Sequence, residues 1–207
     1  MADDTTPKSS GPVLQLLASG LQFWIRQQCE AVESLELQLH GSAMALLRGR
    51  LEGVSLVARR VVFRELEIEM AELRSGPIAI QVGKLLKGQS LRLEQPFQIT
   101  GYVAFTGAGL SRSLCAPSWR GLGDQLADGL LGLAPLQAVS IERDRLVLTA
   151  QGMRCDTLPA AVEGCLEVQG VDNELRVRLP GDPNIAIETA NLEGGMLQLH
   201  GNARVSP

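Results

Sequence analysis

The chain has 207 residues, is 45% hydrophobic but only 3% aromatic, and carries a net charge of −4 from 19 basic and 23 acidic residues. This length suits one large domain or two small ones, with a core built mainly of aliphatic side chains. Nucleic-acid binding needs a clustered basic face, so the acidic balance argues against a nucleic-acid partner. The four cysteines form no C-x-x-C pair and lie in apolar stretches, which favours free thiols in a reducing compartment.

Residues 1–12 are small and polar and are expected to form a disordered tail, whereas residues 13–207 contain no linker and predict a single domain. From Val13 to Val32, apolar residues recur every three or four positions, which indicates an amphipathic helix that either packs on a sheet or lies on a membrane surface. Polar residues interrupt the stripe, so its apolar run is too short to span a membrane. Lys8 alone precedes the helix as a basic residue, which makes it a poor signal peptide. The stripe consists of Leu14, Leu17, Leu21, Ile25, Cys29 and Val32.

Strands are predicted next. Leu35–Leu39 alternates with period two, and Arg60–Met70 is predicted to be one half-buried antiparallel strand with its glutamates in solvent. The apolar positions before Arg64 have the opposite parity from those after it, so we expect a twist, a bulge or a strand buried on both faces there. Arginines at 48–64 form either a solvated sheet face or a weak contact with anionic lipid head groups. Further alternation occurs at 78–82, 91–93 and 99–105.

Two shorter helices are predicted in mid-chain. Thr106 is suited to cap the first, whose apolar side carries Leu110 and Leu114. The second, Ser118–Leu133, contains four glycines, so it depends on tertiary contacts and is the element that we expect to move. Strand patterns then return at 136–142, 145–150, 162–169, 174–179, 184–189 and 196–200.

The only two histidines lie in a repeated string, Leu37-Gln-Leu-His-Gly-Ser-Ala and Leu197-Gln-Leu-His-Gly-Asn-Ala. A shared metal or acid–base pair is one interpretation, and two equivalent strand ends that leave the sheet at a glycine is the other, which we favour. Phosphate-binding-loop, zinc-protease and serine-hydrolase motifs are absent from the sequence. We therefore expect no catalytic residues, no metal site and no cofactor.

Four stretches, at 23–33, 47–66, 82–93 and 105–114, carry a resemblance to a known family. They read Phe-Trp-Ile-Arg-Gln-Gln-Cys-Glu-Ala-Val-Glu, then Leu-Arg-Gly-Arg-Leu-Glu-Gly-Val-Ser-Leu-Val-Ala with Val-Phe-Arg-Glu-Leu, then Val-Gly-Lys-Leu-Leu-Lys-Gly-Gln-Ser-Leu-Arg-Leu, then Phe-Thr-Gly-Ala-Gly-Leu-Ser-Arg-Ser-Leu. In spacing and residue class they resemble the bacterial LmeA-like phospholipid-binding family. The resemblance covers Leu14–Leu133 best. Where the family usually has acidic and amide residues, this chain has Gly109 and Ser111-Arg112.

The resemblance implies non-catalytic binding or shuttling of a phospholipid or other acyl lipid, in membrane or envelope lipid homeostasis. It implies an α+β fold similar to tubular lipid-binding domains, with a strongly curved, mostly antiparallel sheet wrapped around the N-terminal helix. Some relatives are exported, but without a recognised leader or lipid anchor we expect a cytoplasmic protein, with possible peripheral contact at the inner face of a membrane.

Long strands, the amphipathic helix and an aliphatic interior can leave an elongated apolar groove, and ordinary core packing is the alternative that produces the same pattern. The resemblance favours the groove. A scaffold or oligomerisation module would use the same apolar faces to bind protein, and this alternative stays open. An enzyme acting on a lipid lacks residues to carry the chemistry. The expected lipid-binding residues are Leu21, Trp24, Leu66, Ile68, Phe105, Trp119, Leu122 and Leu126.

Overall fold

The structure is a computed structural model that describes residues 12–79 and 95–206. It is α+β with antiparallel sheets, as expected, and it begins with a helix, α1 (Pro12–Gln28). The expected tail lies outside the described residues except for Pro12, and so do the predicted strand positions at 80–82 and 91–93. The expected curvature of the sheet, and its wrapping around α1, remain predictions.

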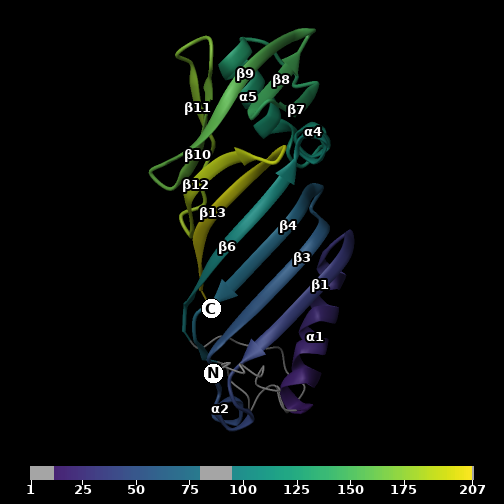
Figure 1. The fold of residues 1–207 in the computed structure, drawn as a ribbon, viewed down its shortest axis with the longest axis vertical. Helices are drawn as coiled ribbons and strands as arrows, with labels where there is room; N and C mark the ends of the chain where they lie inside the picture. Colours follow the sequence, from purple (N-terminus) through teal and green to yellow (C-terminus); the bar gives the residue numbers. More distant parts are fainter. Residues whose placement is uncertain (1–11, 80–94, 207) are drawn as a thin grey trace, which may run out of the picture.

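A six-stranded antiparallel sheet runs along most of the long axis of the molecule (Figure 1). α1 lies along β1 at one side of this sheet, which is the packing alternative predicted for the helix. In spatial order the strands are β1 (Ala31–His40), β3 (Gly53–Phe63), β4 (Leu66–Ser75), β6 (Phe97–Thr106), β13 (Met196–Val205) and β12 (Ile185–Glu193).

The predicted single strand over Arg60–Met70 is wrong. The chain reverses at Arg64 and Glu65, whose φ values of 49° and 62° make a two-residue hairpin turn between β3 and β4. Such turns favour asparagine or glycine because both central residues need positive φ, and neither is present here. The turn accounts for the opposite parity of the apolar residues on its two sides.

A second, five-stranded antiparallel sheet occupies the end of the molecule away from α1 (Figure 1). Its spatial order is β11 (Arg176–Arg178), β10 (Cys165–Gly170), β9 (Met153–Val162), β8 (Arg145–Ala150) and β7 (Ala138–Glu142). The strand predicted at 162–169 in fact begins after a turn at Glu163–Gly164, and β9 was not predicted. Pro159 lies inside β9, where a proline normally argues against an inner strand.

The predicted ends of α1 and β13 are also corrected. α1 stops at Gln28, and Val32, predicted to be helical, belongs to β1. The first histidine string ends β1 at Gly41, as predicted, but the second continues through Gly201 inside β13. A Cβ on Gly201 would lie 2.3 Å from the Ala186 carbonyl oxygen. This glycine therefore lets β12 and β13 pack closely and does not mark the end of a strand.

The remaining elements lie at the two ends of the six-stranded sheet. Near α1, the short helix α2 (Ala43–Leu47) is followed by a two-stranded pairing of β2 (Arg50–Leu51) with β5 (Ile78–Ala79). At the other end, α4 (Gly107–Cys115) and α5 (Arg120–Leu131) pack against the second sheet. The Thr106 hydroxyl accepts a hydrogen bond from the Gly109 amide at 3.0 Å, which confirms the predicted cap of α4.

Buried side chains form one large cluster around α4, α5 and the second sheet, and a separate cluster between α1, α2 and the first sheet. A small third cluster, Leu35, Ala58 and Val61, lies on the first sheet, and Ile68 contacts both it and the large cluster. Each of the two main clusters borders a cavity.

Candidate functional site

One face of the six-stranded sheet is apolar along its length. Residues paired across neighbouring strands share a face. Leu73 of β4 pairs with Gly101 in the middle of β6, and Leu197 of β13 pairs with Phe105 near its end. Residues two apart on a strand also share a face, so Phe105 and Phe97, at opposite ends of β6, point the same way. We call this the inner face of the sheet.

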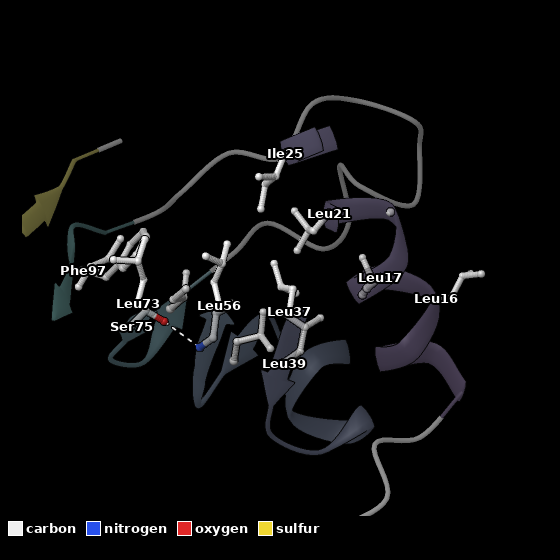
Figure 2. Close-up of a pocket in the computed structure, with 15 residues that line it drawn as sticks. Leu16, Leu17, Leu21, Ile25, Leu37, Leu39, Leu56, Leu73, Ser75 and Phe97 are labelled. Atoms are coloured by element: carbon white, nitrogen blue, oxygen red, sulfur yellow. Dashed lines mark hydrogen bonds between the residues drawn. The ribbon is translucent and has the colours of Figure 1, made fainter. Parts of the chain in front are cut away.

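A cavity of about 470 Å³ lies between α1 and the inner face (Figure 2). Of the described residues that line it, Ser75 alone has a polar side chain. The Ser75 hydroxyl accepts a hydrogen bond from the Val54 amide at 2.8 Å, so part of its hydrogen-bonding capacity is already used. We call this the α1 cavity. Its lining is Leu16, Leu17, Gly20, Leu21, Ile25, Leu37, Leu39, Leu51, Val54, Leu56, Leu73, Ser75, Ile78, Phe97 and Ile99.

The inward stripe of α1 forms one wall of this cavity. Leu14, Leu17, Leu21 and Ile25 all contact the buried cluster beneath the helix, as the sequence predicted. This spacing places them on one side of an α-helix. Leu14 is only 2% exposed and anchors the first turn, whereas the other three are half-buried and border the open volume, where Figure 2 shows Leu17, Leu21 and Ile25 turned toward the strands.

A second cavity, of about 330 Å³, lies at the other end of the inner face, beneath α4 and α5. We call it the α5 cavity. Apolar residues of β4, β6, β7, β8, β10, β12 and β13 also line it. Among the described residues that border it, Asp182 is the charged one; it is exposed, and its carboxylate accepts a hydrogen bond from the Asn184 backbone amide at 2.8 Å.

The turn between β3 and β4 holds the helices that cover the α5 cavity. The Trp119 indole nitrogen donates a hydrogen bond to the Arg64 carbonyl at 2.7 Å, and the Ser118 amide donates one to the Glu65 carboxylate at 2.8 Å. The hydrogen bonds from Ser118 lower the pKa of Glu65. The junction between α4 and α5 is therefore fixed to a hairpin tip more than fifty residues earlier in the chain.

A polar contact joins β4 to α4 beside this turn. The Arg112 guanidinium donates two hydrogen bonds to the Glu67 carboxylate, and these lower the pKa of Glu67. The buried Ser113 hydroxyl accepts from the Glu67 amide at 2.8 Å and donates to the Gly109 carbonyl at 2.8 Å. Arg112 and its neighbour Ser111, which accepts from the Val139 amide, thus have structural partners.

Two of the glycines of α5 serve close packing. A Cβ on Gly123 would lie 2.5 Å from the Leu114 carbonyl oxygen, and a Cβ on Gly129 would lie 2.4 Å from a methyl carbon of Val177. Nothing lies within 4 Å of a Cβ on Gly121. These two glycines let α4 and β11 approach the backbone of the helix. That the helix depends on such contacts for its stability, and that it moves, stay predictions.

The structure divides the residues that the sequence singled out for lipid binding. Leu21 lines the α1 cavity, whereas Ile68 contacts the large cluster and the small third cluster and lines neither cavity. Trp24 is 60% exposed and also lines neither. The other five predicted residues all line the α5 cavity: Leu66, Phe105, Trp119, Leu122 and Leu126.

Sequence reasoning missed the strand side chains of the α1 cavity. Leu37 and Leu39 were recognised as sharing a face, but period two alone does not distinguish a filled core from an open cavity. Leu56, Leu73 and Phe97 come from three other strands, and only the pairing of these strands brings them together.

The two histidines lie on different strands with three strands between them. His40 shares a hydrogen bond with the Ser55 hydroxyl at 2.7 Å, and the His200 ring lies 4.8 Å from the Tyr102 ring. They form no shared site, which excludes the metal or acid–base interpretation of their strings. Within residues 12–79 and 95–206, no group of three potential ligands is placed to hold a metal ion.

Comparison with known proteins identifies a family for this chain. Neither the curated proteins nor the solved structures contain a match to this chain. In the described part of the chain, no helix has the length and apolar character needed to cross a membrane. The family model described as LmeA-like phospholipid-binding matches residues 10–201 of the 207, which is nearly the whole chain. The chain therefore belongs to the LmeA-like phospholipid-binding family.

Proposed function

We propose that this protein binds a phospholipid without catalysis and holds an acyl chain in the α1 cavity. The observation that carries this proposal is the cavity wall, whose described residues present apolar side chains from α1 and six strands and a single hydroxyl, that of Ser75. Burial of apolar surface contributes roughly 25 cal/mol per Å² before association costs. A volume of about 470 Å³ falls within the usual range of ligand pockets, roughly 300–1,000 Å³.

The α5 cavity is the second part of the proposed site. Both cavities border the same apolar face of the sheet, so one lipid or two can occupy an elongated groove along it. Trp119, Leu122 and Leu126 supply the helical wall of this second part. Curvature of the sheet around α1 would enclose the chain further, and we propose that residues 13–207 act as one lipid-binding domain.

The cellular role that we infer is lipid homeostasis at a membrane, by binding or shuttling of phospholipid inside the cell. Membership of a phospholipid-binding family supports the ligand class. Peripheral contact with the inner face of a membrane would give the protein access to its ligand. A scaffold that binds protein through the same surfaces is the alternative, and the content of bound lipid distinguishes the two.

Gly20 offers a sharp test of the α1 cavity. It lines the cavity, nothing lies within 4 Å of a Cβ built on it, and it occupies the middle of α1. Alanine and tryptophan both have a higher helix propensity than glycine, which costs about 1 kcal/mol relative to alanine. Gly20→Trp should therefore fill the cavity mouth without unfolding the chain, and Gly20→Ala is its matched control.

The measurement is native mass spectrometry of purified protein before and after organic extraction, combined with titration of a fluorescent phospholipid. We expect the wild type and Gly20→Ala to carry and bind lipid, and Gly20→Trp to bind at least tenfold more weakly. Undiminished binding by folded Gly20→Trp would remove the α1 cavity from the site. A wild type that binds no lipid would favour the scaffold alternative.

A further inference from the structure

α1 carries a second apolar stripe on its outer side. Leu16, Phe23 and Trp24 are 77%, 65% and 60% exposed. With Gly20 they occupy positions i, i+4, i+7 and i+8, which lie on one side of a helix. This stripe is distinct from the inward one, whose four residues are buried or half-buried. Single exposed apolar residues are ordinary, but a stripe of three large ones over two turns marks an interaction surface.

The outer stripe is continuous with the mouth of the α1 cavity. Leu16 and Gly20 belong to the stripe and also line the cavity. Figure 2 shows Leu16 turned away from Leu17, Leu21 and the strand side chains, at the edge of the group. An apolar path therefore leads from the exposed side of α1 into the cavity without crossing a charged side chain of that helix.

Charge indicates what covers the stripe. Of the seventeen residues of α1, Arg26 alone is charged at neutral pH, and it is exposed. A bilayer interface accepts exposed leucine, phenylalanine and especially tryptophan, and a helix that enters it must not bury carboxylates. α1 contains no carboxylate. A bilayer is also where the acyl chain that the cavity accepts is found.

We propose that α1 is a membrane-docking helix, whose outer residues Leu16, Phe23 and Trp24 insert into a lipid bilayer so that the mouth of the α1 cavity opens into it. The proposal rests on the proposed function for its ligand, because docking gives an acyl chain a route that avoids water. Apolar contact and not charge drives the docking, since the stripe itself is uncharged. Binding should therefore occur on zwitterionic vesicles and change little when salt is raised.

The test is co-sedimentation of the full chain with phosphatidylcholine vesicles. The double variant Phe23→Ser, Trp24→Ser should lose vesicle binding at least tenfold, because both side chains point away from the core. Its matched control is Gln15→Ser, Gln22→Ser, which introduces the same residue twice on the polar side of the same helix. The control should bind vesicles like the wild type. Circular dichroism and thermal melts establish that each variant is folded.

A second readout separates docking from lipid binding. Short-chain phosphatidylcholine below its critical micelle concentration reaches the cavity without a bilayer, so the Phe23→Ser, Trp24→Ser variant should still bind it. A wild type that binds the monomeric lipid but not vesicles would overturn docking and leave the proposed function standing. A wild type that binds vesicles but not the monomeric lipid would overturn the proposed function and leave membrane docking standing.

Two further outcomes overturn the proposal. Undiminished vesicle binding by the folded Phe23→Ser, Trp24→Ser variant would show that another surface meets the membrane. A dimer of the wild type that this variant abolishes, without vesicle binding by the wild type, would assign the stripe to a second copy of the chain.

Discussion

The indole nitrogen of Trp119 lies 2.7 Å from the backbone carbonyl oxygen of Arg64 and donates a hydrogen bond to it. This contact joins the start of α5 to the tip of the β3–β4 hairpin, while the ring of Trp119 borders the α5 cavity. One side chain thus both lines the cavity and fixes the helix that covers it. The position of α5 over the sheet depends on the hairpin turn.

We expect Trp119→Phe to keep the aromatic wall but lose the hydrogen bond. A hydrogen bond of this kind contributes about 1 kcal/mol, so the free energy of unfolding should fall by about that amount. Urea denaturation followed by circular dichroism measures it. Trp24→Phe is the matched control and should change stability by less than about 0.5 kcal/mol, because Trp24 is exposed. An equal loss in both variants would contradict the role of the Arg64 contact.

A pH dependence follows from Glu67. The hydrogen bonds from Arg112 hold the pKa of Glu67 below its ordinary value of 4.5. A carboxyl with a lowered folded pKa stabilises the fold above its unfolded pKa, and the stabilisation disappears as pH falls through the folded pKa. The stability difference between the wild type and Glu67→Gln should therefore be constant near neutral pH and shrink below 4.5.

Arg112→Gln provides the control for this titration. In that background the ion pair is absent, so Glu67→Gln should lower the free energy of unfolding by less, and the remaining difference should vary less with pH. Urea denaturation at several pH values, run for the four proteins of the double-mutant cycle, measures both quantities. A difference between the wild type and Glu67→Gln that grows on acidification would contradict the assignment.

The same substitution should have opposite effects at two neighbouring positions of α5. Gly121→Ala should stabilise the protein by up to about 1 kcal/mol, because nothing lies within 4 Å of the new Cβ and alanine favours the helix. Gly123→Ala should destabilise it, because its Cβ would lie 2.5 Å from the Leu114 carbonyl oxygen and force α4 and α5 apart. Thermal melts of the two variants measure both effects. Stabilisation by Gly123→Ala as well as by Gly121→Ala would mean that α4 and α5 are free to separate.

A substitution at Leu122 tests the α5 cavity without changing a fully buried residue. Leu122 is half-buried and lines the cavity, whereas Leu126 is 2% exposed inside the largest buried cluster, where a carboxylate would unfold the chain. We expect Leu122→Asp to weaken phospholipid binding at least tenfold, about 1.4 kcal/mol. Leu122→Met keeps the apolar volume and should bind normally. Fluorescent-lipid titration of the folded variants measures this, and equal binding by both would exclude the α5 cavity from the lipid site.

Several elements were determined by the sequence itself, because their signals are local. The inward stripe of α1 follows from spacing, since residues three and four apart share a helix side. Thr106 caps α4 because its hydroxyl reaches an amide three residues on. Leu35, Leu37 and Leu39 are buried together because strand side chains alternate. The four stretches that resemble the family predicted that the chain belongs to it, and the family model confirms this prediction.

Only the tertiary structure decided the remaining features, because they depend on contacts between distant residues. The hairpin at Arg64 and Glu65 adopts positive φ without glycine or asparagine, held by the strand pairing and by Trp119 and Ser118. β9 forms despite Pro159 because β8 pairs only with Met153–Thr157 of this strand, so among the described strands β10 is the one paired neighbour at Pro159 and β9 has an edge there. Trp24 could not be placed by periodicity, because it lies seven residues after Leu17 of the inward stripe and yet is 60% exposed in the structure. The α1 cavity exists because side chains of six strands and one helix converge without filling the space between them.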